Sequence, residues 1–183
     1  MQLAYDVSRK VGNVTFHPTA DNVLASASGD YTVKFWDIEK SANQLSLKHT
    51  DIIQSLSFNR DGSTLVTTCR DKKIRVWDPR AGKVAQEGAG HSGAKNSRAV
   101  YINNDRIATT GFGKMSDRQL GLWDLKNLSQ PIGGFTMLDQ SAGVVMVLSL
   151  YIPYAHNSHF MIVTQRFSIL PAKGLNKSRL SSN

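Results

Sequence analysis

Alternating apolar and polar residues recur along this chain in three short stretches that share one frame. In each stretch an Asp stands six residues before a Trp, and the Trp is followed by a second Asp. The stretches read DYTVKFWD, DKKIRVWD and DRQLGLWD, and they begin at Asp30, Asp71 and Asp117. The three Trp residues of the chain all occupy this position: Trp36, Trp77 and Trp123. Strict alternation is typical of a half-buried β-strand, so each stretch predicts a strand that ends at its Trp.

The spacing of these strands predicts how they are organised. Successive Trp residues are 41 and 46 residues apart, which is the period of a propeller blade built from four short strands. Turn-forming residues divide each interval into further strands. The predicted strands are 12–17, 23–28, 32–36 and 44–48 in the first unit, 52–58, 64–69, 73–77 and 83–86 in the second, and 97–102, 106–110 and 119–123 in the third.

These units set the predicted fold class and domain organisation. The chain is expected to be all-β, with a partial propeller of about three four-stranded antiparallel blades in residues 1–146. An enlarged turn at 111–117 accounts for part of the longer second spacing. Residues 147–183 contain no Trp-Asp unit and end in a polar, basic segment from Lys173. They are therefore expected to be an irregular tail that is partly disordered.

Two histidines indicate a buried polar network inside the blades. His49 lies 22 residues before Asp71, and His91 lies 26 residues before Asp117. We expect each His to hydrogen-bond to the Asp of the turn or to groups around it, with the Trp ring covering the pair. An unpaired buried carboxylate would be costly, so the network predicts structural roles for these residues.

A hydroxyl on the second strand of each blade is expected to join this network. In the first unit that group is Ser28, beside Asp30 and Trp36, whereas the register of the second unit puts Cys69 there. A thiol is the weaker hydrogen-bonding group. Val7 stands where the first unit would carry its His, so we expect the first network to be incomplete.

The sequence carries no pattern of catalytic or metal-binding residues. The single cysteine excludes an internal disulfide and any zinc site built from several cysteines. GAGHSG at 88–93 matches G-x-G-x-x-G, but a dinucleotide site needs a helix after the motif, and a strand-like alternation follows here. Three equivalent Asp residues favour scaffolding, since a catalytic pair would be singular. We therefore predict a protein that is no enzyme and takes no cofactor or metal.

The net charge of +8 is unevenly distributed. Residues 1–143 carry 18 Lys and Arg against 14 Asp and Glu, and residues 144–183 carry four bases and no acid. No basic run is interleaved with stacking aromatics, so we expect no nucleic acid as a partner. The apolar segment 144–154 is too short for a membrane span of about 20 residues. A local basic cluster has two open interpretations, a solvated strand edge or a contact for an acidic protein: Lys72, Lys73, Arg75 and Arg80, with Lys83 nearby.

The units resemble WD40 repeats, and three segments are similar to the coronin family in particular. These segments are HPTA at 17–20 followed by NVL at 22–24, TCRDKKIRV at 68–76, and TTGFGKMSDRQ at 109–119 before LWD at 122–124. The third segment is the most specific, since ordinary WD40 repeats do not carry it. The resemblance covers about residues 8–146.

The resemblance implies three blades of a seven-bladed propeller in a cytoplasmic protein of the actin cytoskeleton, at the actin cortex or actin patches. Coronins bind filamentous actin through a non-catalytic docking surface and regulate its turnover. They act on the Arp nucleating complex through a C-terminal coiled coil, so that partner is expected only for a full-length form. The family's first blade, with its basic actin-contact segment, and its coiled coil have no counterpart here.

Two other interpretations stay open beside actin binding. One is a general WD40 scaffold for another complex. The other is a non-functional fragment, truncated, spliced or misassigned from residue 147 onward. Three blades cannot close a propeller ring, so we expect an exposed sheet edge, marginal stability and self-association.

Overall fold

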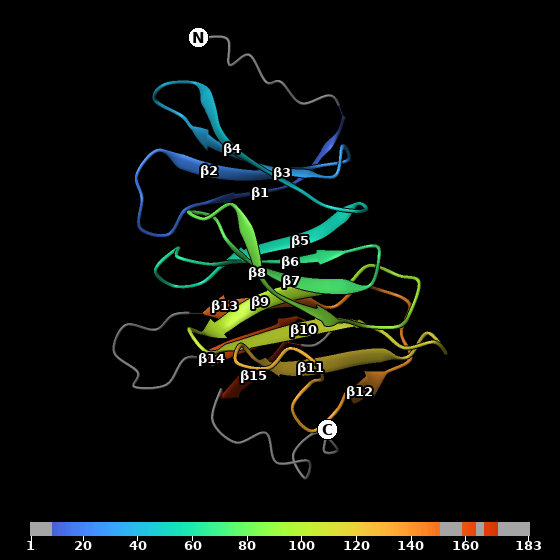
Figure 1. Ribbon diagram of the computed structural model, residues 1–183. Coiled ribbons are helices and arrows are strands. Elements are labelled where there is room, and N and C mark those ends of the chain that lie inside the picture. The colour runs from blue at the N-terminus through green and yellow to red at the C-terminus, as the bar shows by residue number, and fades with distance from the viewer. Residues whose placement is uncertain (1–8, 151–158, 164–166, 172–183) are drawn as a thin grey trace.

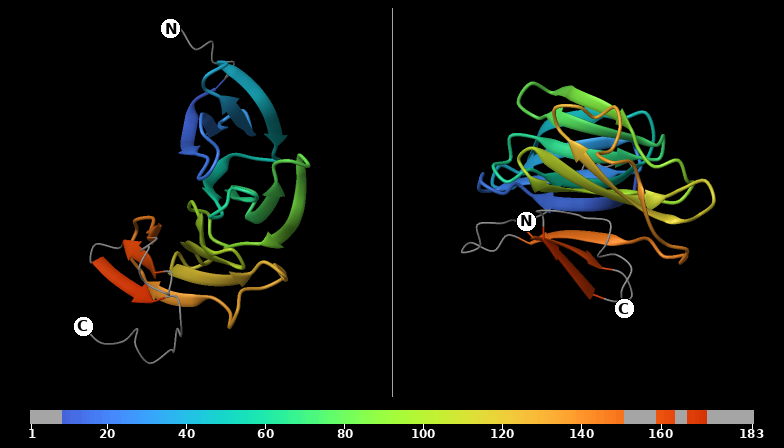
Figure 2. Two further views of the ribbon diagram at one scale, coloured as in Figure 1. Left: turned by 90° about the vertical axis from the view of Figure 1, so that its left-hand side faces the viewer. Right: turned by 90° about the horizontal axis from the view of Figure 1, so that it is seen from below.

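The chain forms three blades that stand side by side in an open arc (Figures 1 and 2). The computed structural model describes residues 9–150, 159–163 and 167–171. Each blade is a four-stranded antiparallel sheet in sequence order. The strands are β1 (Val11–Phe16), β2 (Val23–Ser28), β3 (Thr32–Asp37) and β4 (Ala42–Lys48), then β5 (Ile53–Phe58), β6 (Leu65–Cys69), β7 (Lys73–Asp78) and β8 (Lys83–Ala89), then β9 (Arg98–Asn103), β10 (Arg106–Phe112), β11 (Arg118–Asp124) and β12 (Thr136–Asp139). The predicted all-β blade architecture is confirmed.

The blades are held together by apolar side chains that alternate along each strand. Alternation places every second side chain on the same face of a sheet, and the facing sides of successive blades bury these residues against one another. Between the first and second blades, Ala25, Val33 and Phe35 meet Leu65 and Trp77. A second cluster joins the second and third blades. The first strand of each blade packs on the first strand of the blade before it, β5 on β1 and β9 on β5.

The third blade departs from the predicted strand boundaries. Its fourth strand, β12, follows an eleven-residue connection after β11 and was not among the predicted strands. β10 continues to Phe112, and the backbone N–H of Gly113 donates to the carbonyl of Asp117 at 2.8 Å. The enlarged turn is therefore partly absorbed into the sheet, and the loop proper is only residues 113–117.

The region expected to be an irregular tail contains a further sheet. Strands β13 (Met146–Leu150), β14 (His159–Val163) and β15 (Phe167–Pro171) pair antiparallel in that order. β13 lies against β9 and β10, as β9 lies against β5 and β6. The first of these strands thus occupies the place of the inner strand of a fourth blade. The predicted disordered end, residues 173–183, lies outside the described residues.

The first blade, at the other end of the arc from β13, exposes an apolar sheet face. In β1, Val14 and Phe16 are 57% and 67% exposed. They share a face with Leu24 and Trp36, because Phe16 pairs with Leu24 and Leu24 with Trp36. No blade among the described residues packs on this face. The sheet edge and face expected from an unclosed ring are therefore present at the first blade.

Candidate docking surface

In the second blade a His, a Thr and a Trp meet in one hydrogen-bonded group. The indole N–H of Trp77 donates to Thr67 Oγ1 at 3.1 Å, and Nε2 of His49 lies 3.0 Å from the same oxygen. The imidazole and indole rings pack against each other at a tilt of 43°, with their centroids 4.7 Å apart. Burial lowers the pKa of His49 to about 4, so the imidazole is neutral at pH 7.

The third blade repeats this group with one addition. Trp123 Nε1 donates to Thr109 Oγ1 at 2.7 Å, and His91 Nε2 lies 3.0 Å from that oxygen. The ring of Phe135, from the long connection before β12, stacks on His91 at 4.6 Å and meets Trp123 edge-on at 5.9 Å. Burial also lowers the pKa of His91 to about 4.

The hydroxyl that joins each Trp is not the one predicted. In the first blade Trp36 Nε1 donates to Ser26 at 2.8 Å, whereas Ser28 donates to the carbonyl of Arg9. In the second blade Thr67 takes the place assigned to Cys69, whose thiol donates to the carbonyl of Asp51. Each hydroxyl lies two residues beyond the residue that pairs with the Trp, as Thr67 lies two beyond Leu65. The long indole reaches diagonally to this same-face neighbour.

The three turn Asp residues have three different partners. Asp30 accepts from the backbone N–H and the hydroxyl of Thr32, at 3.0 and 2.6 Å. Asp117 accepts from the Gln119 amide at 2.7 Å. Asp71 accepts from Thr50 and from the Arg75 guanidinium, each at 2.5 Å. Of the two partners expected for each His, the turn Asp or a group around it, the structure shows the second: His49 and His91 bond to Thr67 and Thr109.

Arg75 is the centre of an ion-pair cluster that the sequence did not reveal. It is 4% exposed, and its guanidinium contacts Asp71 at 2.5 Å and Glu87 at 2.7 Å. Burial disfavours the Asp71 carboxylate, but hydrogen bonds from Arg75 and Thr50 outweigh it and lower the pKa of Asp71 to about 2. Glu87 lies on β8, directly opposite Arg75, and this cross-strand placement was the available signal.

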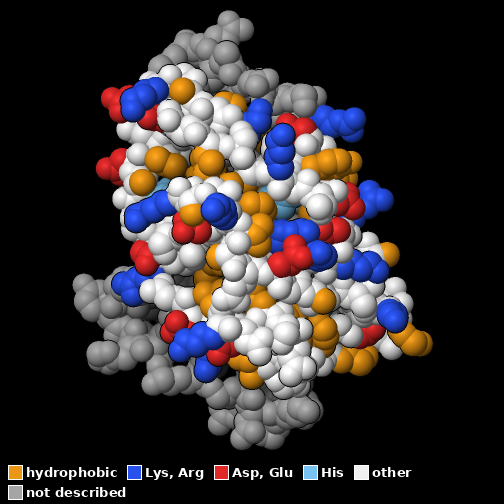
Figure 3. All heavy atoms as spheres, viewed as in Figure 1, with side chains coloured by type: hydrophobic (Ala, Val, Ile, Leu, Met, Phe, Trp, Pro, Cys, Tyr) orange, Lys and Arg blue, Asp and Glu red, His pale blue; other side chains and the backbone are white. Residues whose placement is uncertain are grey.

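The predicted basic patch therefore does not form one surface. Arg75 is enclosed by acids and is corrected from a partner contact to a structural residue. Lys72 and Lys73 are exposed at the start of β7, whereas Arg80 is exposed in the turn beyond its other end. At about 3.3 Å per residue the strand separates these two ends by roughly 17 Å. Figure 3 accordingly shows Lys and Arg side chains interspersed with Asp and Glu rather than one basic field.

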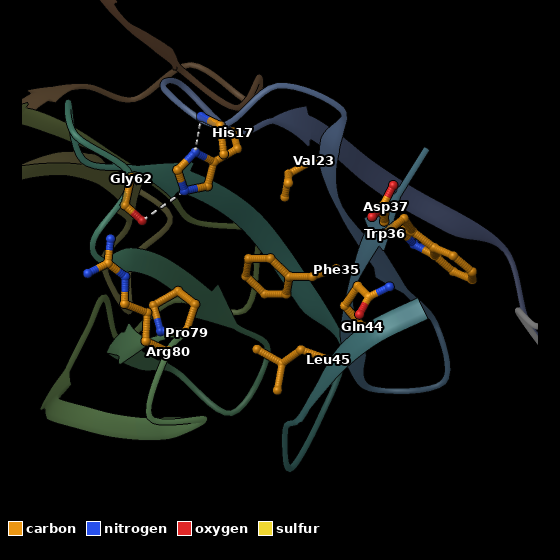
Figure 4. Close-up of a pocket in the computed structure, with 11 residues that line it drawn as sticks. His17, Val23, Phe35, Trp36, Asp37, Gln44, Leu45, Gly62, Pro79 and Arg80 are labelled. Atoms are coloured by element: carbon orange, nitrogen blue, oxygen red, sulfur yellow. Dashed lines mark hydrogen bonds between the residues drawn. The ribbon is translucent and has the colours of Figure 1, made fainter. Parts of the chain in front are cut away.

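A groove opens between the first two blades at the Arg80 end (Figure 4). Its volume is about 350 Å³, and its floor is apolar. Phe35 and Leu45 come from the first blade, and Pro79 and Arg80 come from the turn between β7 and β8. Sequence reasoning did not predict this groove, because its walls come from two different blades that are distant in the sequence.

Neither a metal-binding cluster nor a membrane-spanning helix is found in the described part of the chain. It contains no group of three or more His, Cys, Asp or Glu side chains that could hold a metal ion. Within the same residues, no helical segment has the length and apolar character that a membrane crossing requires. The surfaces that can contact another molecule include the exposed charged turns, the groove between the blades and the exposed apolar face of the first blade.

Comparisons with known proteins agree with this architecture. The model of the WD domain, G-beta repeat, matches residues 6–37 and 42–78. Coronin-like protein crn1 of Schizosaccharomyces pombe is 61% identical over 140 residues, or 76% of this chain. The coronin-like protein of Saccharomyces cerevisiae is 54% identical over 141 residues, also 76% of this chain. The crystal structure of the WD40 domain from Toxoplasma gondii coronin superposes with a TM-score of 0.73 at 27% identity, and covers 84% of this chain and 42% of that one.

The coverage of the relatives is much smaller than the coverage of this chain. The matched residues span 23% of the S. pombe protein and 22% of the S. cerevisiae protein. The matched repeats are non-catalytic WD40 units. This chain therefore belongs to the coronin family of WD40-repeat proteins, and it corresponds to about a quarter of the length of these relatives.

Proposed function

We propose that this chain binds actin filaments through a non-catalytic WD40 surface, as a cytoplasmic component of the actin cortex or patches. The observation that carries the proposal is the 61% identity to a coronin-like protein over 140 residues. That stretch is long enough to include all three Trp-Asp units. The Arp nucleating complex is proposed as a partner only of a longer form that contains the coiled coil.

The exposed basic pair Lys72 and Lys73 is the proposed contact with the acidic filament. Lys72 donates one hydrogen bond, to the carbonyl of Ser92 at 2.7 Å, and an ammonium group has two more protons to donate. Lys73 contacts Glu87 at 2.5 Å, but about half of its side chain is exposed. Such rim charges act mainly on association rate and salt dependence.

Co-sedimentation with actin filaments tests the proposal. The full chain is expected to pellet with filaments at low salt, and less at 0.5 M salt because exposed charges are screened. The double variant Lys72→Glu, Lys73→Glu is expected to pellet several-fold less. Lys126→Glu changes an equally exposed lysine at the far end of the third blade, and it should pellet with at least half the efficiency of the unmodified chain.

Two outcomes would contradict the proposal. If the folded chain pellets no more than a scrambled-sequence control, direct actin binding is wrong and a WD40 scaffold for another complex replaces it. If the two lysine variants pellet alike, the chain reaches actin through a different face, and the assignment to Lys72 and Lys73 fails.

A further inference from the structure

The groove between the first and second blades has the features of a peptide-binding site. Its floor consists of Val23, Phe35 and Leu45 from the first blade and Pro79 from the second. In Figure 4 the ring of Phe35 points into the middle of the groove, with Leu45 below it. An apolar pocket with a few polar groups at its rim is the usual form of a ligand site.

The charges at the rim favour one kind of ligand. Asp37 is already paired, since Lys40 Nζ lies 3.2 Å from its carboxylate. Arg80 is exposed. Its backbone N–H donates to Asp78, but its guanidinium has no acid partner among the described residues. An unpaired guanidinium beside an apolar floor is complementary to a carboxylate.

The walls of the groove are held at a constant separation by direct bonds between the blades. The ring of His17 accepts at Nδ1 from the backbone N–H of Ala20 at 2.9 Å, so Nε2 carries the proton and donates to the carbonyl of Gly62 at 3.1 Å. Gly62 has φ +76°, and a Cβ there would lie 2.0 Å from the His17 ring. The hydroxyl of Thr19 also donates to the carbonyl of Asp61 at 2.9 Å. The groove is thus preformed, which lowers the cost of binding.

The equivalent position between the second and third blades is filled by a side chain of this chain itself. Val76 pairs with Gln86 in the second blade as Phe35 pairs with Leu45 in the first. There the eleven-residue connection from β11 to β12 folds back, and Leu128 is buried to 3% exposure in the same cluster as Val76. The Gln86 amide also donates to the backbone carbonyl of Leu125. The β7–β8 turn has only four residues, 79–82, so the first junction has no leucine of its own.

We propose that this groove binds an extended segment of a partner protein in which a leucine-sized apolar residue is next to an Asp or Glu. The apolar side chain packs on Phe35 and Leu45, as Leu128 packs beside Val76. The neighbouring carboxylate accepts hydrogen bonds from the Arg80 guanidinium. This site is separate from the lysine pair proposed for actin, because it lies at the other end of β7.

The test is an NMR titration of the isotopically labelled full chain with synthetic peptides, without actin. The first peptide has ten residues, with Leu-Asp at its centre and Gly and Ser elsewhere. Two others replace Leu by Ser or Asp by Lys. The Leu-Asp peptide is expected to shift the resonances of Phe35, Leu45 and Arg80, and each altered peptide is expected to bind about tenfold more weakly, the loss of one charge-assisted hydrogen bond or one buried side chain.

Two variants complete the design. The Arg80→Glu variant is expected to bind the Leu-Asp peptide about tenfold more weakly than the unmodified chain does. It is expected to bind the Leu-Lys peptide more tightly than the Leu-Asp peptide. Lys83→Glu makes the same charge change at an exposed residue that does not line the groove, and it should leave the affinity within twofold. Equal binding of the Leu-Asp and Leu-Lys peptides, or equal losses in the two variants, would overturn the proposal. Tighter binding by a chain without residues 172–183 would instead identify the chain's own end as the occupant.

Discussion

The first and second blades carry the same Trp-Asp pattern, but the surroundings of the two Trp side chains differ. Trp77 stacks on His49, shares Thr67 with it, and belongs to the apolar cluster between the blades. Trp36 donates to Ser26, and it belongs to none of the three apolar clusters among the described residues. Its face continues into the exposed Phe16.

The same contrast appears at the residue two positions before each Trp. Arg75 of the second blade is enclosed by Asp71 and Glu87, whereas Lys34 holds the equivalent place in the first blade and lies over the Trp36 ring at 5.8 Å. The repeat motif therefore places the Trp, while the neighbouring blade and the facing strand decide how much stability the Trp contributes. Among the described residues, an inner blade packs against another blade on both faces, and the first blade does so on one face.

Replacement of each of these two Trp residues should give the largest difference in stability loss between the two blades. Trp77→Ala leaves a cavity between two sheets and removes the indole donor from Thr67, which keeps only its bond to His49. We expect it to lower the free energy of unfolding by about 3–5 kcal/mol. Trp36→Ala should cost about half as much, because no blade among the described residues packs on its face. Urea unfolding followed by circular dichroism measures both. Equal losses would show that the two blades are supported alike.

The ion-pair cluster gives the next largest effect. Arg75→Met leaves Asp71 and Glu87 without their shared cation, and we expect a loss of about 3 kcal/mol. The pKa of Asp71 should rise from about 2 toward its ordinary value, because its strongest hydrogen-bond donor is gone. Lys34→Met is the matched change; it removes the ammonium group from above the Trp36 ring and is expected to cost about 1 kcal/mol. The two urea midpoints and a carboxyl NMR titration check this, and a stabilised Arg75→Met variant would refute it.

The pH dependence of stability should report the buried histidines. Their folded-state pKa values of about 4 lie below the ordinary value of 6.5, so the unfolded chain binds more protons between these values. The contribution of each His is complete above pH 6.5 and is lost as the pH falls toward 4, on the order of 2 kcal/mol per His. The Asp71 contribution is lost only below about pH 4, since its pKa is about 2.

Substitution of one histidine isolates this effect. His49→Gln should remove about half of the change in unfolding free energy between pH 6.5 and 4, measured by urea titration at several pH values. The first blade should contribute nothing to this pH dependence through a blade His, since the sequence has Val7 at the spacing where that His is expected. An unchanged slope in His49→Gln would place the titrating groups elsewhere.

Local patterns explain which parts of the fold could be predicted. Eleven of the twelve blade strands follow from alternation, turn residues and the Trp period, because these signals lie within a few residues of the strands they specify. β12 was missed since its connection from β11 runs through eleven residues with no alternation. The sheet from β13 to β15 was missed because no repeat motif marks it, although its apolar segments are visible in the sequence.

Spacing along the chain is enough to predict three Trp-Asp blades and the positions of their Trp, His and Asp residues, and short residue motifs are enough to predict the family. The partners of these residues depend on how the blades pack. Thr67 rather than Cys69 meets Trp77, because the indole reaches across strands to a same-face neighbour. Arg75 is not part of an exposed basic patch, because Glu87 on β8 pairs with it. The groove at Phe35 exists because a short turn leaves open what Leu128 fills one blade further on. These contacts join residues distant in sequence, and burial sets their strength.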